Sequence, residues 1–181
     1  MALIENAADV CEADAPVWVE ENREALIARG YQIEQVDLRT YKGNVEGLRE
    51  KLAAKDALWL GGGNTFYLRW ILKDTGADVI IKKLVTNGMV YGGGSAGAVV
   101  AGPTLKYFED ADDPNDSPEV ILEGLHLTEA VVVPHAGGQE YGEAMKKIDG
   151  FLTSDGYETI PLTDAQAVIL YDEEDRRIIP R

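Results

Sequence analysis

Two glycine-rich turns constrain the fold of this chain most strongly, because each lies between a short apolar run and a helical stretch. The first, Gly61-Gly62-Gly63, follows the apolar run Ala57–Leu60. The second, Gly92-Gly93-Gly94-Ser95, follows Met89–Tyr91. Strands that alternate with helices of roughly ten residues or more are typical of parallel sheets covered by helices. The sequence therefore predicts an α/β three-layer sandwich with a mostly parallel sheet.

The other elements follow from hydrophobic periodicity and from residues that start or stop helices. Expected helices cover Pro16–Arg29, Val45–Lys55, Thr65–Lys73, Val79–Thr86 and Gly142–Leu152. Expected strands cover Ala2–Glu5, Gln32–Leu38, Ala130–Pro134, Ile160–Leu162, Ala167–Tyr171 and Arg176–Ile179. The Asp- and Pro-containing segment Glu109–Pro118 is expected to be a surface loop. No linker divides the chain, so residues 1–181 are expected to form a single domain.

The charge balance excludes several classes of partner. Seventeen Lys and Arg face 32 Asp and Glu, which gives a net charge of −15. Such a charge repels phosphate backbones and anionic lipids, so neither nucleic acid nor a membrane is an expected partner. The single cysteine, Cys11, excludes an internal disulfide and a cysteine-built metal site. The N-terminal residues do not resemble a signal peptide, and a cytoplasmic location is expected.

Ser95 is the candidate nucleophile. It lies in the pattern Gly-x-Ser-x-Gly, between the strand ending at Tyr91 and an apolar stretch, Ala98–Ala101, that suits the start of a helix. A sharp strand-to-helix turn exposes the serine oxygen above the sheet, and the helix N-terminus favours developing negative charge. The alternative is a glycine-rich turn that binds an anion or only reverses the chain.

His135 is the candidate general base, because it directly follows the apolar run Val131–Pro134. The carboxyl ends of parallel strands meet at one edge of a sheet, so His135 is expected near Ser95. A base there could take the proton of Ser95. The other histidine, His126, lacks this placement and is expected to cap a turn.

A carboxylate is needed to orient the histidine. Several acidic residues lie between Ser95 and His135, which matches the order serine, acid, histidine found in α/β-hydrolases. Most of this run must be solvated, and the sequence leaves Glu109 and Asp110 as equal candidates.

The turn Gly61–Thr65 can supply backbone N–H groups. Those groups could cradle a phosphate or donate to an oxyanion, although the turn lacks the lysine of a P-loop and the spacing of a dinucleotide-binding motif. Paired with Ser95, the turn suggests half of an oxyanion hole, with Asn64 and Thr65 near the substrate. The alternative is a tight turn in which Asn64 or Thr65 caps the next helix.

With these motifs assembled, the chain resembles the aspartyl dipeptidase (peptidase E) family of serine peptidases. That family is related to cyanophycinase and shares the flavodoxin-like fold of class I glutamine amidotransferases. The motifs that carry the resemblance are Trp59–Phe66, Gly94–Ala98, Gly102-Pro103-Thr104, Asp112-Asp113-Pro114 and Pro134-His135. The resemblance covers essentially the whole chain.

The resemblance implies specific roles for these residues. Ser95 would be the nucleophile and His135 the base, with Glu109 or Asp110 as the acid. The backbone N–H groups of Gly63 and Ala96 would form the oxyanion hole. Neither a metal nor an organic cofactor is implied. The expected function is hydrolysis of small peptides, as a dipeptidase with a preference for N-terminal aspartate. The alternatives are a cyanophycinase-like or other amide hydrolase and a catalytically idle, ligand-binding homologue.

Two features depart from the family pattern. The family begins with a strand that this chain lacks, so an empty strand position and a homodimer that covers it are expected. Family members specific for aspartate also carry arginines after the histidine, whereas Ala136–Ile148 contains none. Lys146, Lys147 and Arg69 are the candidates to replace such an arginine as a carboxylate clamp.

Overall fold

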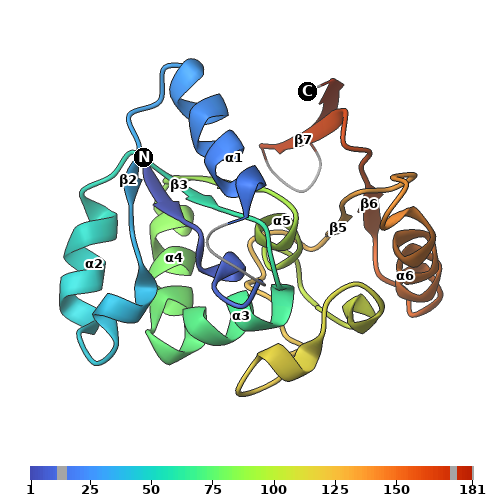
Figure 1. Cartoon of the computed structure of the whole chain (residues 1–181), viewed down its shortest axis with the longest axis horizontal. Helices are drawn as coiled ribbons and strands as arrows, with labels where there is room; N and C mark the ends of the chain where they lie inside the picture. Colours follow the sequence, from blue (N-terminus) through green and yellow to red (C-terminus); the bar gives the residue numbers. More distant parts are fainter. Residues whose placement is uncertain (12–15, 172–174, 181) are drawn as a thin grey trace.

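A four-stranded parallel sheet in the order β2-β1-β3-β4 forms the centre of the fold (Figure 1). The computed structural model describes residues 1–11, 16–171 and 175–180. The strands of the central sheet are β1 (Ala2–Ile4), β2 (Glu34–Gln35), β3 (Ala57–Leu60) and β4 (Val90–Gly93). Two further pairs are the parallel β5 (Val131–Val133) and β6 (Thr159–Pro161), and the antiparallel β7 (Gln166–Leu170) and β8 (Arg176–Pro180). The predicted α/β fold with a parallel sheet is confirmed.

Six α-helices flank these strands among the described residues. They are α1 (Val17–Ala28), α2 (Val45–Ala53), α3 (Thr65–Asp74), α4 (Ala77–Thr86), α5 (Ala96–Val99) and α6 (Gly142–Ser154). Short 3₁₀ turns are η1 (Asn6–Ala8), η2 (Leu38–Tyr41), η3 (Phe108–Asp110) and η4 (Pro114–Asp116). None of the described helices is long and apolar enough to cross a bilayer.

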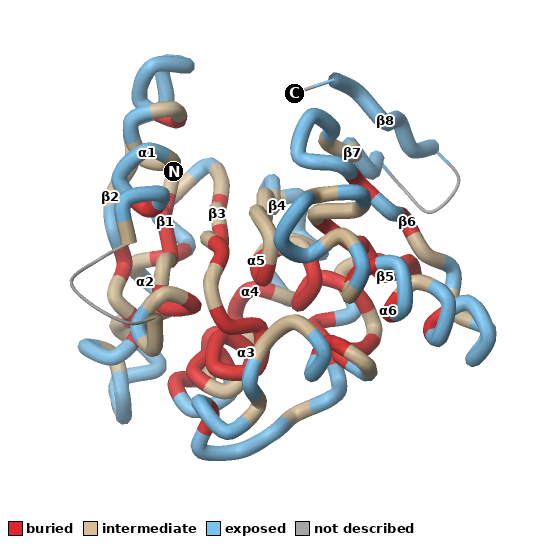
Figure 2. Tube along the Cα trace, turned by 45° about the vertical axis from the view of Figure 1, so that its right-hand side comes forward, coloured by how far each residue is buried: buried red, intermediate tan, exposed pale blue. Residues whose placement is uncertain are grey.

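The strands β1 and β3 are apolar because most of their side chains are buried. All three residues of β1 are buried, and in β3 Leu58 and Leu60 are fully buried between helices. In Figure 2 the buried residues concentrate in the central strands and in α3 and α5, whereas β8 is exposed along its length. The main core therefore lies between the strands β1, β3 and β5 and the helices that pack against them.

One predicted strand is shorter than expected. The strand expected over Gln32–Leu38 spans only Glu34–Gln35, because the side chain of Asp37 accepts the N–H of Arg39 and starts the turn η2. The strand β1 pairs with β2 on one side and with β3 on the other, and the empty strand position expected from the family resemblance stays a prediction.

The Asp37 carboxylate is expected to make folding stability depend on acid pH. It receives the guanidinium of Arg39 (2.8 Å) and the side-chain amide of Asn6 (3.0 Å), and these donors lower the pKa of Asp37 to about 2. A carboxyl whose pKa is lower in the folded state stabilises the fold above its unfolded pKa of about 3.9. That stabilisation is lost as the pH falls from about 4 to 2.

We therefore expect Asp37→Asn to lower the free energy of unfolding at pH 7 and to have little effect near pH 2. The side chain of Asp37 is 39% exposed, so the loss should not exceed about 1 kcal/mol. Urea unfolding at several pH values measures this difference, with the exposed Glu24→Gln as the control. A difference that stays constant from pH 7 to pH 2 would contradict the assignment.

Candidate active site

Ser95 lies at the sharp turn between β4 and α5. Its backbone has φ 50° and ψ −116°, which is a strained conformation for a residue other than glycine. The turn is possible because Gly97 packs directly on β3. A Cβ atom on Gly97 would lie 2.1 Å from the carbonyl oxygen of Leu60. The sequence pattern thus folds into the predicted strand–turn–helix, with the serine at its apex.

Tyr91 supports this turn from within β4, a role that the sequence did not suggest. Its hydroxyl donates to the carbonyl oxygen of Gly97 at 2.5 Å. Burial raises the pKa of Tyr91 well above its ordinary value, so the hydroxyl stays protonated and acts as a donor. The hydrogen bond links β4 to the first turn of α5.

A continuous chain of polar contacts starts at Ser95. The Nε2 atom of His135 lies 2.9 Å from the Oγ atom of Ser95, and the Nδ1 atom of His135 lies 2.6 Å from an oxygen of Asp164. The ring of Tyr141 lies beside His135, with 5.5 Å between the ring centroids. A serine hydroxyl, an imidazole and a carboxylate therefore stand in the order that nucleophilic catalysis requires.

Asp164, and not Glu109 or Asp110, is the acid that contacts His135, so the structure corrects this prediction. The reason is topological. Strands β5 and β6 are parallel, with Val133 opposite Pro161, so the residues that follow both strands meet at one edge of the sheet. The sequence held this signal, since the predicted strand Ile160–Leu162 is followed at once by Thr-Asp.

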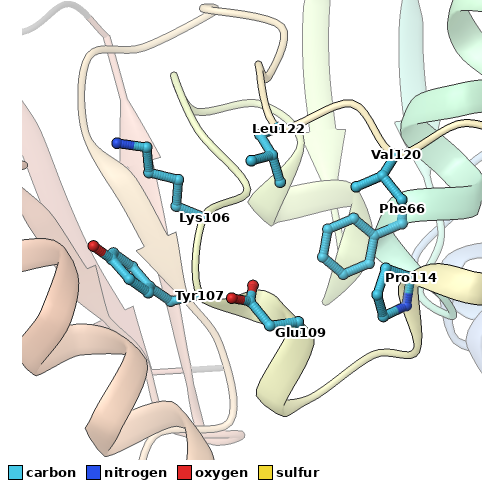
Figure 3. A pocket seen from close by; sticks show the side chains of 7 residues that line it. All are labelled: Phe66, Lys106, Tyr107, Glu109, Pro114, Val120 and Leu122. Atoms are coloured by element: carbon cyan, nitrogen blue, oxygen red, sulfur yellow. The ribbon is translucent and has the colours of Figure 1, made fainter.

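Glu109 lies on the turn η3 and faces a different cavity (Figure 3). Its carboxylate points into a hollow of about 350 Å³ whose other walls are mostly apolar. The lining residues are Phe66, Lys106, Tyr107, Glu109, Pro114, Val120 and Leu122. Asp110 is exposed on the same turn. Neither carboxylate is available to orient His135 in this arrangement.

The glycine turn after β3 passes close to Ser95, as its predicted role requires. A Cβ atom on Gly62 would lie 3.1 Å from the Cβ atom of Ser95. Gly63 has φ +127°, and a side chain there would collide with the carbonyl oxygen of Ala7 at 2.2 Å. Among the described residues, no acceptor takes the N–H of Gly63 or that of Ala96. Both donors thus remain free to serve a ligand.

Asn64 and Thr65, the residues expected near the substrate, both make structural hydrogen bonds. The side-chain oxygen of Asn64 accepts the N–H groups of Phe66 and Tyr67 and caps α3. Its amide nitrogen donates to the carbonyl oxygen of Asp113 at 2.8 Å. Thr65 is buried. The capping alternative described from the sequence therefore applies to Asn64.

The acidic loop expected over Glu109–Pro118 is attached to the glycine turn. The backbone N–H of Thr65 donates to Oδ2 of Asp112 at 2.9 Å, and the side-chain amide of Asn64 donates to Asp116 at 3.1 Å. Burial raises the pKa of Asp112, while the N–H of Thr65 and the nearby His135 act in the opposite direction. The loop thus brings a second, partly buried carboxylate into the neighbourhood of His135.

None of the cations proposed as a carboxylate clamp has a described contact with Ser95, His135 or Asp164. Arg69 is buried, and its guanidinium pairs with Asp78 at 3.1 Å and donates to the carbonyl oxygen of Glu123 at 2.6 Å. Lys146 and Lys147 are exposed on α6. In the part of the chain that the structure describes, no group of three or more His, Cys, Asp or Glu side chains could hold a metal ion.

His126 lies apart from this group, with φ 49°, and its Nε2 atom lies 3.6 Å from a carboxylate oxygen of Glu123. This described contact is with a carboxylate three residues earlier, whereas the sequence led us to expect His126 to cap a turn. Of the two histidines, only His135 contacts Ser95.

Known proteins resemble this chain over most of its length. The model of peptidase family S51 matches residues 3–178. The chain is 29% identical to the uncharacterized peptidase Lin0382 of Listeria innocua, over 87% of this chain and 74% of that protein. It is 34% identical to peptidase E of a Nostoc species, over 65% of this chain and 45% of that protein. The solved structure of a candidate peptidase E from Listeria monocytogenes has a TM-score of 0.86 and 26% identity, and covers 99% of this chain and 85% of its own.

Proposed function

The chain belongs to peptidase family S51 and is a peptidase, and on that premise we propose that it is a serine peptidase acting through Ser95, His135 and Asp164. The observation that carries the proposal is the unbroken series of contacts from Asp164 through His135 to Ser95, at 2.6 and 2.9 Å. Both distances lie within the range of a hydrogen bond.

The first half of the reaction forms an acyl-enzyme. His135 takes the proton of Ser95 through Nε2 while Oγ attacks the carbonyl carbon of the scissile peptide bond. The carbonyl oxygen becomes an oxyanion, which the free N–H groups of Gly63 and Ala96 stabilise. The C–N bond then breaks, and the leaving amine takes the proton from His135.

The second half of the reaction regenerates the serine. A water molecule gives a proton to His135 and attacks the ester carbonyl, and the proton then returns to Oγ of Ser95 as the acid product leaves. Asp164 holds the proton on Nδ1, so that Nε2 is the basic nitrogen, and it stabilises the imidazolium in both halves.

We propose short peptides, and dipeptides first, as the substrates. The cavity beside His135 has a volume of about 310 Å³ and is lined by His135, Gly138, Gln139, Glu140, Tyr141 and Asp164. This volume is at the lower end of the range for small-molecule sites, which supports a substrate of one or two residues on either side of the scissile bond. A cyanophycinase-like amide hydrolase would use the same three residues on a different substrate.

Covalent labelling of the serine tests the proposed function directly. We expect a fluorophosphonate probe to label the folded protein on Ser95, as peptide mapping by mass spectrometry would show. Ser95→Ala should give no labelling, and His135→Ala should label far more slowly, because the base that activates the serine is gone. A folded wild-type protein that does not react would favour the catalytically idle alternative.

The assembly and location of the protein stay predictions. A homodimer is expected from the family comparison, and sedimentation equilibrium would distinguish it from a 19.7 kDa monomer. The hairpin of β7 and β8 exposes apolar side chains, among them Ile169, Ile178 and Ile179, which supports an apolar contact between copies. A cytoplasmic location is likewise proposed.

A further inference from the structure

The cavity of about 310 Å³ lies on the histidine side of the proposed reaction centre. Among the described residues, its lining includes His135 and Asp164 but not Ser95 or the glycine turn after β3. In acyl transfer the histidine gives its proton to the leaving nitrogen, which must therefore come within hydrogen-bond reach of Nε2. The residue that follows the scissile bond would then extend along the wall that His135 contributes.

The segment after His135 forms another wall of this cavity and is held by backbone hydrogen bonds. The N–H of Gly138 donates to the carbonyl oxygen of His135, and the N–H of Gly142 donates to that of Gly138, both at 3.0 Å. A Cβ atom on Gly138 would lie 3.5 Å from Oδ2 of Asp164. Residues 139–141, which also line the cavity, are thus carried on two consecutive turns anchored at His135.

Two side chains of this segment differ in what they offer a ligand. The ring of Tyr141 lies 5.5 Å from that of His135, centroid to centroid, and is 37% exposed, so it presents an open aromatic surface. Glu140 is exposed and forms no ion pair with a described residue. Asp164 adds a second carboxylate, and no described lysine or arginine lines the cavity. The lining therefore combines negative charge with one aromatic ring.

We propose that this cavity holds the leaving residue of the substrate, and that Glu140 and Tyr141 select a basic one, lysine or arginine. This inference rests on the proposed peptidase function. The aliphatic part of such a side chain would pack on the ring of Tyr141, while its charged end meets the carboxylate of Glu140. An acidic leaving residue would instead bring a like charge to Glu140. This preference concerns the residue after the scissile bond, whereas the aspartate preference expected from the family concerns the residue before it.

The test compares the dipeptides Ala-Lys, Ala-Gln and Ala-Glu. All three form the same alanyl-enzyme, so the second half of the reaction cannot contribute to a preference among them. We expect kcat/KM of the wild type for Ala-Lys to be about threefold above that for Ala-Gln and about tenfold above that for Ala-Glu, as for one exposed charge that attracts or repels. Because Glu140 is exposed, the ratio of Ala-Lys to Ala-Glu should fall in about 0.5 M salt.

Variants of Glu140 assign the preference to its carboxylate. Glu140→Gln keeps the size of the side chain and should lower the ratio of Ala-Lys to Ala-Glu from about tenfold to about two- or threefold. Glu140→Lys should invert the ratio. Glu143→Gln is the matched control, because Glu143 is exposed on the first turn of α6 and does not line the cavity, and it should leave the ratio unchanged.

The reversed dipeptides Lys-Ala, Gln-Ala and Glu-Ala show which side of the scissile bond the cavity serves. They place the varied residue before the scissile bond, so any preference among them should be the same in Glu140→Lys as in the wild type. A wild type that prefers Ala-Glu, or an unchanged ratio of Ala-Lys to Ala-Glu in Glu140→Lys, would overturn the inference. A change in Glu140→Lys confined to the reversed dipeptides would overturn it as well.

Fluorophosphonate labelling distinguishes the two ways of failing. If Ser95 is labelled but Ala-Lys is not the preferred substrate of its series, only the role of the cavity is wrong. If Ser95 is not labelled in the folded protein, the proposed function itself fails.

Discussion

Replacing Ser95 with alanine is expected to lower kcat for peptide hydrolysis by about 10⁵- to 10⁶-fold, the largest effect of any single change in this protein. The substitution removes the atom that forms the acyl-enzyme, and His135 then has no nucleophile to activate. What would remain is catalysis by substrate binding and the oxyanion hole, and in serine peptidases that residual rate still exceeds the uncatalysed rate.

The fold should tolerate this change, which keeps the test specific. Alanine has the same Cβ atom as serine and loses only Oγ, whose one described partner is His135. The melting temperature should therefore change little, and Ser154→Ala, on α6 and distant from the turn, serves as the matched control for activity. Hydrolysis near the wild-type rate by Ser95→Ala would refute the proposed mechanism.

Asp164→Asn is expected to have the second largest effect, a fall in kcat of about 10²- to 10⁴-fold. An asparagine can present its NH₂ group to Nδ1 of His135, which favours the tautomer with the proton on Nε2 and removes the base from Ser95. The side chain of Asp164 is 63% exposed, so water can replace part of its role and the loss should stay below that of Ser95→Ala.

The same kcat measurement shows which of Asp164, Glu109 and Asp110 orients His135. Glu109→Gln and Asp110→Asn should each change kcat by less than about threefold, because the structure places neither carboxylate on His135. A steady-state assay on one dipeptide, with all three variants at equal concentration, gives the ranking. If Glu109→Gln lost as much activity as Asp164→Asn, the contact seen at Nδ1 would not be the one used in catalysis.

The contact between Ser95 and His135 could be predicted because each residue lies just after an apolar strand. Parallel strands present their carboxyl ends at one edge of the sheet, so Ser95 after β4 and His135 after β5 were expected to be neighbours and are in contact. The same rule, applied to β6, points to Asp164. The prediction followed chain order instead, which does not show that β5 and β6, the strands before His135 and Asp164, pair side by side.

Other features depended on side-chain hydrogen bonds that hydrophobic patterns do not encode. The strand expected around Val36 is cut short because Asp37 caps a 3₁₀ turn. Asn64 was expected to face substrate. Instead, its side-chain oxygen accepts a hydrogen bond that caps α3, and its side-chain nitrogen donates to the acidic loop. Asn is favoured at helix N-caps, and its amide can equally donate to or accept from a ligand. Only the folded structure therefore shows which role Asn64 has.

The three hydrogen bonds that attach the acidic loop to the glycine turn have a consequence for the cost of binding. Thr65 holds Asp112, and Asn64 holds Asp113 and Asp116, while a side chain at Gly63 would collide with the backbone of Ala7. The glycine turn, which carries the N–H groups proposed for an oxyanion, is thus held together with the acidic loop as one unit. Because this unit is already fixed, substrate binding restricts few additional torsion angles of the protein. Less binding energy is then offset by lost conformational entropy, and more is left to stabilise the transition state.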